Sequence, residues 1–283
     1  MQKFSFSGHE TFVCKQYWLK KGFDFINSKK SFTEESSVVD LGVGKNMVAS
    51  IRFWMKSFNL LDNTDNLTDF AKYVFGKKGK DPYVEDIGTL WLLHYFLVKT
   101  SRASIYHLFF NEFSSENTYF EKENIIKFIL RKLQESNINN VNSKTIEKDI
   151  NVLIRSYYKD ENTKDIEEDS INLLNELEMI KKDKKHYYFN HDNKQDIPEE
   201  ILFFTILDFL DKNEKTVSIN RICYSDLSPG KIFLLNKPEI IEKIRLLESK
   251  FSGIVYSSQA GIETVQLKKT FGKWGILDDY YRN

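Results

Sequence analysis

The residues nearest the N-terminus that could do chemistry are His9 and Glu10, in the run Ser-Gly-His-Glu-Thr-Phe. Zinc proteases carry a similar pair, but their H-E-x-x-H motif needs a second histidine where this chain has Val13. Cys14 would be a thiol nucleophile only if His9 lay within reach as a base. The alternative is that Ser7, His9 and Glu10 hydrogen-bond the start of a helix. His9 and Glu10 are therefore the candidate catalytic residues, and no metal site is predicted.

A second stretch, Gly-Val-Gly-Lys at 42–45, has the residue types of a phosphate-binding loop. A P-loop has the motif G-x-x-x-x-G-K-[ST]. It needs a glycine five residues before the second glycine, and a serine or threonine hydroxyl directly after the lysine. Here Val39 occupies the first glycine position and Asn46 the hydroxyl position. Val lacks the backbone freedom of glycine, and an amide is a poor ligand for Mg²⁺. We therefore predict no nucleotide site and no cofactor.

The same stretch fits the turn of a helix-turn-helix over residues 35–60. Residues 38–41 end a short helix, Gly42 and Gly44 permit a sharp turn, and a second helix follows from Asn46. Its buried stripe is predicted to be Met47, Val48, Ile51, Trp54, Met55 and Phe58. Its outer face would carry Lys45, Asn46, Ser50, Arg52 and Lys56. Small hydrogen-bonding residues between positive ones suit a helix that enters the major groove of DNA.

A second helix with the same character follows Ser143, a predicted N-cap. Ile146, Ile150, Leu153, Ile154 and Tyr157 form its buried side. Lys144, Lys148, Asn151 and Arg155 line one outer stripe and are candidate DNA contacts. Glu147 and Asp149 stand on neighbouring faces and dilute that charge. With a helix over 121–135 before it and a hairpin at 180–189 after it, the segment is predicted to be a winged helix-turn-helix.

The predicted fold class is mainly α with small β-hairpins (α+β). It comprises two winged helix-turn-helix-like modules and a small α+β C-terminal region. The predicted domains are 1–115, containing the first helix-turn-helix, 116–195, and 196–283. Within them, residues 160–169 are an acidic, solvated loop, 170–180 a helix, and Ser-Pro-Gly-Lys at 228–231 a turn before a strand.

Bulk composition sets further limits. The chain has 41 Lys and Arg against 41 Asp and Glu, so any basic surface for nucleic acid must be local. Two cysteines are too few for a disulfide framework and indicate a reducing compartment. The longest apolar run, Leu90 to Val98, is much shorter than the roughly 20 residues of a membrane span. We expect a cytoplasmic protein with no membrane contact, in which this run is a buried helix.

Three runs together resemble a known family: Phe-Ser-Gly-His-Glu-Thr-Phe at 6–12, Trp-Leu-Lys-Lys-Gly at 18–22, and the segment from Leu41 to Trp54. The combination is similar to DUF4007, a bacterial domain of unknown function, and the resemblance continues near the C-terminus. It implies a prokaryotic protein from phage-defence or DNA-modification gene neighbourhoods, beside phosphoadenosine-phosphosulfate-reductase-like proteins. It supplies no established catalytic residue.

Three hypotheses follow for the function. In the first, the chain binds duplex DNA as a regulator or recognition subunit of a defence or DNA-phosphorothioation system. In the second, it is a protein–protein adaptor for a sulfur-transfer or nuclease partner and makes no DNA contact of its own. In the third, it is an enzyme that uses His9 and Glu10. DNA binding is the hypothesis that the two basic helix faces favour.

Overall fold

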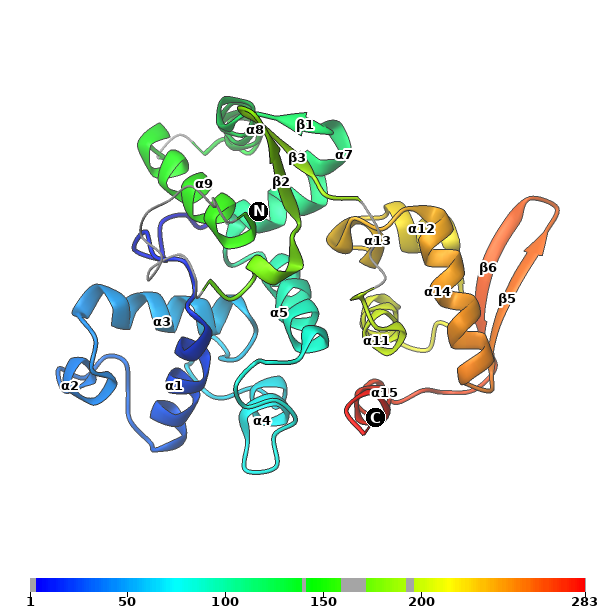
Figure 1. Cartoon of the computed structure of the whole chain (residues 1–283), viewed down its shortest axis with the longest axis horizontal. Coiled ribbons are helices and arrows are strands. Elements are labelled where there is room, and N and C mark those ends of the chain that lie inside the picture. Colours follow the sequence, from blue (N-terminus) through cyan, green and yellow to red (C-terminus); the bar gives the residue numbers. More distant parts are fainter. Residues whose placement is uncertain (1–3, 139–140, 159–171, 192–195, 283) are drawn as a thin grey trace. The chain divides into compact units, whose positions relative to one another are not determined.

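The computed structural model describes residues 4–138, 141–158, 172–191 and 196–282 (Figure 1). By its internal contacts the chain divides into two compact units, Met1–Asn190 and His191–Asn283. Residue 115, the predicted end of the first domain, lies inside the first of these units. The predicted acidic loop at 160–169 lies outside the described residues. No helix in the described ranges is long and apolar enough to cross a membrane.

The first unit begins with three helices, α1 (Gln16–Asn27), α2 (Ser37–Leu41) and α3 (Lys45–Ser57). Gly42 ends α2 with a positive φ of 60°, the left-handed conformation in which glycine avoids a Cβ clash. Gly44 then caps the start of α3. The glycine turn is therefore preceded by a helix, α2, and not by a strand, as the helix-turn-helix interpretation requires. Gly22 lets α1 approach α3, because a Cβ there would meet Met55 Sδ at 2.1 Å.

After α3 the chain makes a single antiparallel bridge, Leu61 to Leu67. The helix α4 (Asp69–Phe75) follows, and then α5 (Ile87–Lys99). Every residue of α5 from Gly88 to Val98 is buried, which confirms the prediction of a core helix there.

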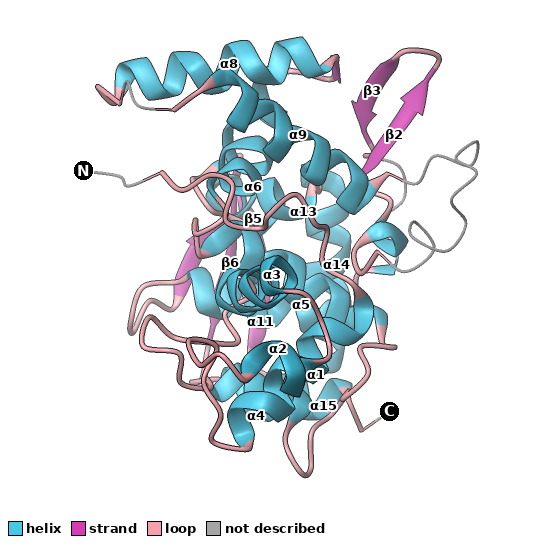
Figure 2. Ribbon diagram, turned by 90° about the vertical axis from the view of Figure 1, so that its left-hand side faces the viewer, coloured by secondary structure: helices cyan, strands magenta, loops and turns pink. Residues whose placement is uncertain are grey.

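The rest of the first unit combines helices with a small sheet. The helices α6 (Ser104–Leu108), η1 (Phe109–Phe113) and α7 (Ser114–Glu116) lead into β1 (Tyr119–Phe120). Next come α8 (Lys122–Glu135), α9 (Ser143–Tyr157), the 3₁₀ turn η2 (Asn175–Leu177), and the hairpin of β2 (Ile180–Asp183) and β3 (His186–Phe189). The antiparallel sheet has the order β1-β3-β2. Figure 2 shows α8, α9 and the hairpin together at one end of this unit.

The prediction of a helix over 170–180 is wrong. Asn172 instead forms a β-bridge with Lys15, and the N–H of Leu173 donates to the carbonyl of Cys14 at 3.1 Å. Only the 3₁₀ turn Asn175–Leu177 is helical among the described residues of that segment, and β2 begins at Ile180. Pairing with a distant part of the chain has therefore overridden the local helical periodicity.

The second unit resembles the 104–189 part of the first unit in the order of its elements. It consists of α11 (Glu199–Phe209), β4 (Thr216–Ser218), α12 (Ile219–Tyr224), α13 (Pro229–Phe233), α14 (Lys237–Lys250), β5 (Ile254–Gln259), β6 (Ile262–Leu267) and α15 (Lys273–Tyr280). Its sheet has the order β4-β6-β5, in which the first strand again pairs with the last. Both units thus pass through helix, strand, helices and hairpin in the same topology.

The Ser-Pro-Gly-Lys stretch is a helix start and not a turn before a strand. Ser228 Oγ accepts the N–H of Lys231, and Pro229 occupies the first position of α13. Proline suits that position because its missing N–H has no partner there in any case. The chain as described is mainly helical with two small three-stranded antiparallel sheets, which confirms the coarse fold class.

Candidate nucleic-acid interface

The Phe-Ser-Gly-His-Glu-Thr-Phe segment runs between α3 and α9 and joins them. Both carboxylate oxygens of Asp149, on α9, accept the backbone N–H of Ser7 at 3.0 Å. Ser50 Oγ, on α3, donates to the carbonyl of His9 at 3.0 Å, and Trp54 Nε1 donates to the carbonyl of Phe12 at 3.2 Å. We call residues 5–12 the N-terminal strap. Its polar contacts hold together the two helices whose outer faces were predicted to bind DNA.

His9 lies at the centre of the strap. Its side chain is 1% exposed and stacks on Trp54 with ring centroids 6.0 Å apart. Its Nδ1 accepts the N–H of Thr11 at 3.1 Å, so a neutral ring carries its proton on Nε2. That Nε2 faces Asp149 Oδ1 at 3.3 Å, an electrostatic contact that is not a hydrogen bond.

The strap does not bring the candidate catalytic pair into one site. Glu10 is exposed whereas His9 is buried, and no contact between their side chains is found among the described residues. The Cys14 thiol is also buried, and burial raises its pKa well above the ordinary value, which disfavours the nucleophilic thiolate. The geometry around His9 is that of a structural junction.

The outer face of α3 is only partly available. Lys45 and Asn46 are exposed at its N-terminal end. Ser50 is fully buried against the strap, so it does not lie on the outer face where the sequence placed it. Sequence periodicity alone missed this because the strap covers a helix face that looks polar.

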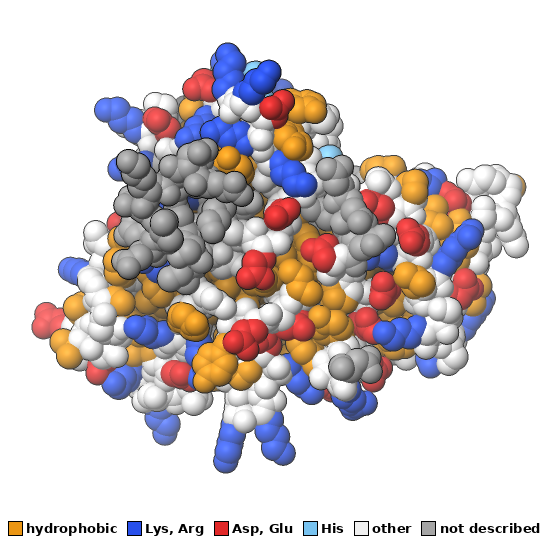
Figure 3. Space-filling model, viewed as in Figure 1, with side chains coloured by type: hydrophobic (Ala, Val, Ile, Leu, Met, Phe, Trp, Pro, Cys, Tyr) orange, Lys and Arg blue, Asp and Glu red, His pale blue; other side chains and the backbone are white. Residues whose placement is uncertain are grey.

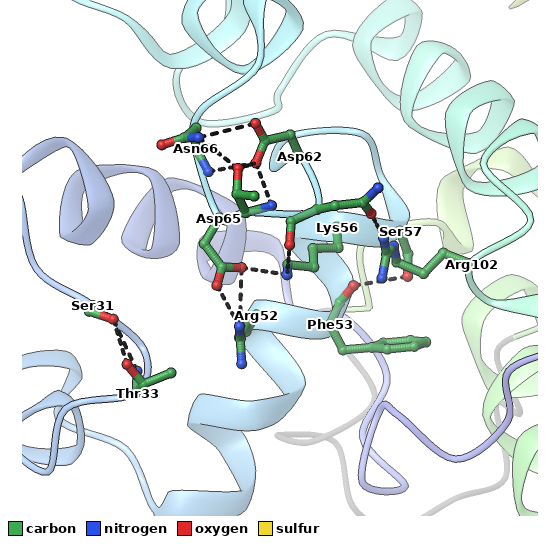
Figure 4. A network of polar contacts seen from close by, with 12 residues as sticks. Ser31, Thr33, Arg52, Phe53, Lys56, Ser57, Asp62, Asp65, Asn66 and Arg102 are labelled. Atoms are coloured by element: carbon green, nitrogen blue, oxygen red, sulfur yellow. Dashed lines mark hydrogen bonds and ion pairs between the residues drawn. The ribbon is translucent and has the colours of Figure 1, made fainter.

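Asp65 neutralises the other two basic residues of α3 (Figure 4). Its carboxylate lies 2.5 Å from Arg52 Nη2 and 2.6 Å from Lys56 Nζ. Burial raises the pKa of Asp65, but hydrogen bonds from Arg52 and Lys56 outweigh that effect and hold the pKa below its ordinary value. The carboxylate therefore stays charged at neutral pH, and α3 presents less positive charge than its sequence suggests.

The outer face of α9 presents three of the predicted cations to the solvent. Lys144, Lys148 and Arg155 are exposed. Asn151 is half-buried and accepts Lys122 Nζ, from α8, at 2.6 Å. Of the two acidic neighbours, Glu147 is exposed and Asp149 points inward to the strap. The structure thus brings the four predicted residues of α9 to one side of the helix and removes one of the two opposing charges.

The β2–β3 hairpin adds a group of cations that were not among the predicted site residues. Residues 181–185 read Lys-Lys-Asp-Lys-Lys: the first three belong to β2, and Lys184 and Lys185 form the exposed turn. Lys182 Nζ lies over Tyr187 at 5.4 Å and over Tyr158, which follows α9, at 5.8 Å. These contacts connect the hairpin to the C-terminal end of α9. Four lysines within five residues, at 181–185, were the signal that could have identified this surface.

In Figure 3 Lys and Arg side chains gather over α8 and this hairpin, interspersed with acidic ones. We call Lys144, Lys148, Arg155, Lys184 and Lys185 the α9–hairpin surface. Its members are long, exposed and positively charged, and they come from one helix and the turn of one adjoining hairpin. Such a surface suits the phosphates of a nucleic acid backbone.

The corresponding face of the second unit differs in charge. Glu263, on β6, accepts Tyr256 OH at 2.7 Å and lies 2.5 Å from Lys237 Nζ on α14. Arg245 lies over the Tyr256 ring at 5.2 Å. The hairpin turn, at Ala260 and Gly261, carries no charge. On this face the described cations are matched by nearby partners.

In the part of the chain that the structure describes, no group of three or more His, Cys, Asp or Glu side chains is arranged to hold a metal ion.

The fold matches solved structures along its whole length. A magnesium ion-bound crystal structure of SspB has a TM-score of 0.87 and 22% identity, with 99% of this chain and 88% of that chain covered. Another SspB crystal structure gives 0.85 and 23% with the same coverage. No curated protein matches the sequence. A family model described as a protein of unknown function (DUF4007) matches residues 6–281, and the chain therefore belongs to the DUF4007 family.

Proposed function

We propose that this protein binds duplex DNA through winged-helix modules, with α9 in the major groove and the β2–β3 turn on the phosphate backbone. The element order in 104–189 supports the assignment, because a first strand pairing with the last strand of a hairpin after two helices is the winged-helix arrangement. The order in 199–267 supports a second module. The helices α1, α2 and α3 with the Leu61–Leu67 bridge support a reduced version with almost no wing.

The observation that carries the proposal is the α9–hairpin surface. Neutralising a phosphate with a lysine or arginine releases condensed counterions, and the resulting affinity falls steeply with salt. Asn151 and Thr145 lie between the cations of α9 and offer hydrogen-bonding groups for base edges. At the start of α3, Lys45 and Asn46 would add a second, weaker contact. The buried Ser50 and the Asp65-bound pair Arg52 and Lys56 have no direct part in it.

We further propose that the DNA-binding step belongs to a DNA-phosphorothioation system, in which the protein serves as a regulator or recognition subunit. The full-length likeness to SspB and the membership of DUF4007 support this context. The partner would be a sulfur-transfer protein of the phosphoadenosine-phosphosulfate-reductase-like type.

Fluorescence anisotropy with a 20-base-pair duplex, plain and phosphorothioated, across a salt series tests the proposal. The double variant Lys148→Gln/Arg155→Gln should weaken binding by about tenfold and reduce the slope of log K against log salt by about 2, since each lost phosphate contact removes roughly 0.9. The matched control is Lys77→Gln/Lys78→Gln, an exposed pair on the loop after α4, at the opposite end of the first unit. If the wild type and both variants bind the duplex with equal affinity, α9 is not part of the DNA interface.

A second candidate function, a protein–protein adaptor, is favoured by one observation on the second unit. Tyr224, Leu246 and Ile262 are 59%, 47% and 65% exposed on α12, α14 and β6, where cations are already paired. Exposed aromatic and aliphatic side chains are enriched in protein interfaces. If the wild-type chain shows no duplex binding at low salt but co-purifies with a sulfur-transfer partner, the adaptor function replaces DNA binding.

A further inference from the structure

The sheet β1-β3-β2 has an outer face that the core does not use. Phe120 and Phe189 point to the inner face, where they pack on Phe109 with ring centroids 5.4 and 4.8 Å away. Side chains alternate along a strand, so Tyr119 and Tyr188 point the other way. Tyr119 is 64% exposed.

The two tyrosines form one continuous aromatic surface. They are direct partners in the register of β1 and β3, and their ring centroids are 5.5 Å apart at an interplanar angle of 42°. An exposed ring forgoes the favourable free energy of burial. In return Tyr119 gains one ring contact, the one with Tyr188. The pair is therefore available to a ligand that offers a flat apolar face.

The charge beside the pair defines that ligand. Lys181 is the register partner of Tyr188 on β2, so Tyr119, Tyr188 and Lys181 lie in one row across the sheet. Lys184 and Lys185 are exposed in the turn that joins β2 to β3. Two described acids lie on this face: Asp183, two residues beyond Lys181 on β2 and register partner of His186, and Glu121, whose carboxylate lies 3.2 Å from His186 Nδ1. Aromatic rings can stack on nucleobases, and lysines can bind the phosphates that join them. This surface is therefore more complementary to a nucleic acid than to an apolar peptide.

We propose that the outer face of β1-β3-β2 is a stacking platform for unpaired bases of single-stranded nucleic acid. Tyr119 and Tyr188 each receive a base, and Lys181 with the turn lysines holds the connecting phosphates. Stacking on aromatic side chains tolerates any base, because each base has a π-face. The inference rests on the proposed function, since it gives DNA held by α9 and the hairpin turn a place for a strand that leaves the duplex. The substrate class is then duplex DNA with an adjoining single-stranded segment.

The test compares a blunt 20-base-pair duplex with the same duplex carrying a six-nucleotide overhang that contains 2-aminopurine, together with the free hexanucleotide. For the wild type, the overhang should raise affinity by about tenfold and change the fluorescence of the 2-aminopurine. Tyr119→Ala/Tyr188→Ala should lose that gain and keep blunt-duplex binding. Tyr119→Phe/Tyr188→Phe should keep both, because a phenyl ring also stacks. Tyr83→Ala, a tyrosine 55% exposed elsewhere in the first unit, is the matched control.

The outcomes separate the two proposals. Blunt-duplex binding with no gain from the overhang, or a gain that survives Tyr119→Ala/Tyr188→Ala, overturns the stacking platform and leaves the proposed function standing. Binding of the overhang and the free hexanucleotide without the blunt duplex overturns duplex binding and supports the platform. Failure to bind any of the three overturns both. Circular dichroism and thermal melting of each variant show that loss of binding is not loss of folding.

Discussion

The two small sheets of this protein belong to modules with the same topology and different surfaces. In 104–189 the hairpin carries four lysines, two on β2 and two in its turn, and adjoins a helix with exposed lysines and an arginine. In 199–267 the turn is Ala-Gly, and the lysine and arginine facing the hairpin are matched by Glu263 and Tyr256. The buried residues that set the topology are of the same kind in both, so the fold does not determine the function. Exposed side chains on one helix and one turn make the difference.

The largest expected effect concerns a feature that only the first module has, the N-terminal strap. Asp149→Ala leaves the N–H of Ser7 without its buried acceptor and removes the carboxylate that faces the His9 ring, which should cost about 3 kcal/mol of local stability. Each unit contains one buried cysteine, Cys14 in the first and Cys223 in the second. Alkylation of the native protein therefore reports the opening of each unit separately.

In Asp149→Ala we expect Cys14 to be labelled about a hundredfold faster and Cys223 to change much less. The matched control is Glu147→Ala, an exposed acid on the same helix, for which both labelling rates should stay within about twofold. Equal acceleration at both cysteines would contradict the idea that the strap stabilises the first unit alone.

The next effect should come from the lysine turn itself. Lys184 has a positive φ of 54°, which favours glycine, so Lys184→Gly/Lys185→Gln should leave stability unchanged or raise it by up to about 1 kcal/mol. Duplex affinity should nevertheless fall about fivefold with a shallower salt slope. The corresponding exchange in the second unit, Ala260→Gly, should affect neither binding nor its salt dependence. Equal loss of affinity in both variants would erase the distinction between the modules.

The smallest effect is expected at the ion network of the second module. A hydrogen bond from Lys237, supported by one from Tyr256, lowers the pKa of Glu263 from its ordinary value of 4.5. A depressed carboxyl pKa stabilises the fold above the unfolded value, and that stability is lost as the pH falls through the folded value. Hairpin stability, followed by NMR, should therefore decline below about pH 4.5 in the wild type. Glu263→Gln should show less of this decline and unchanged duplex affinity at pH 7.

Much of the fold was predictable because it rests on local patterns. The buried run in α5, the glycine turn between α2 and α3, and the stripe of α9 all follow helical periodicity, and the structure confirms them. The helix over 170–180 failed because its backbone pairs with residues 14 and 15, far away in the sequence. The turn at 228–231 failed because the helix-starting role of Pro229 was missed.

The candidate site was less predictable for the same reason. A helical wheel gives Ser50 and Asp149 as polar outer residues, yet the strap buries both of them. It gives Arg52 and Lys56 as available cations, yet Asp65 pairs with each. The sequence also contains the lysines of 181–185, but only the hairpin shows that they adjoin α9.

By itself the sequence determined where the strongly periodic helices α5 and α9 lie, which of their faces are apolar, and that any basic surface must be local in a chain with no net charge. These properties depend on residues within one or two helical turns of each other. The tertiary structure decided which polar residues are buried, which cations are neutralised, and that Tyr119 meets Tyr188 across the sheet. Those outcomes depend on contacts between segments distant along the chain, and no local pattern encodes them.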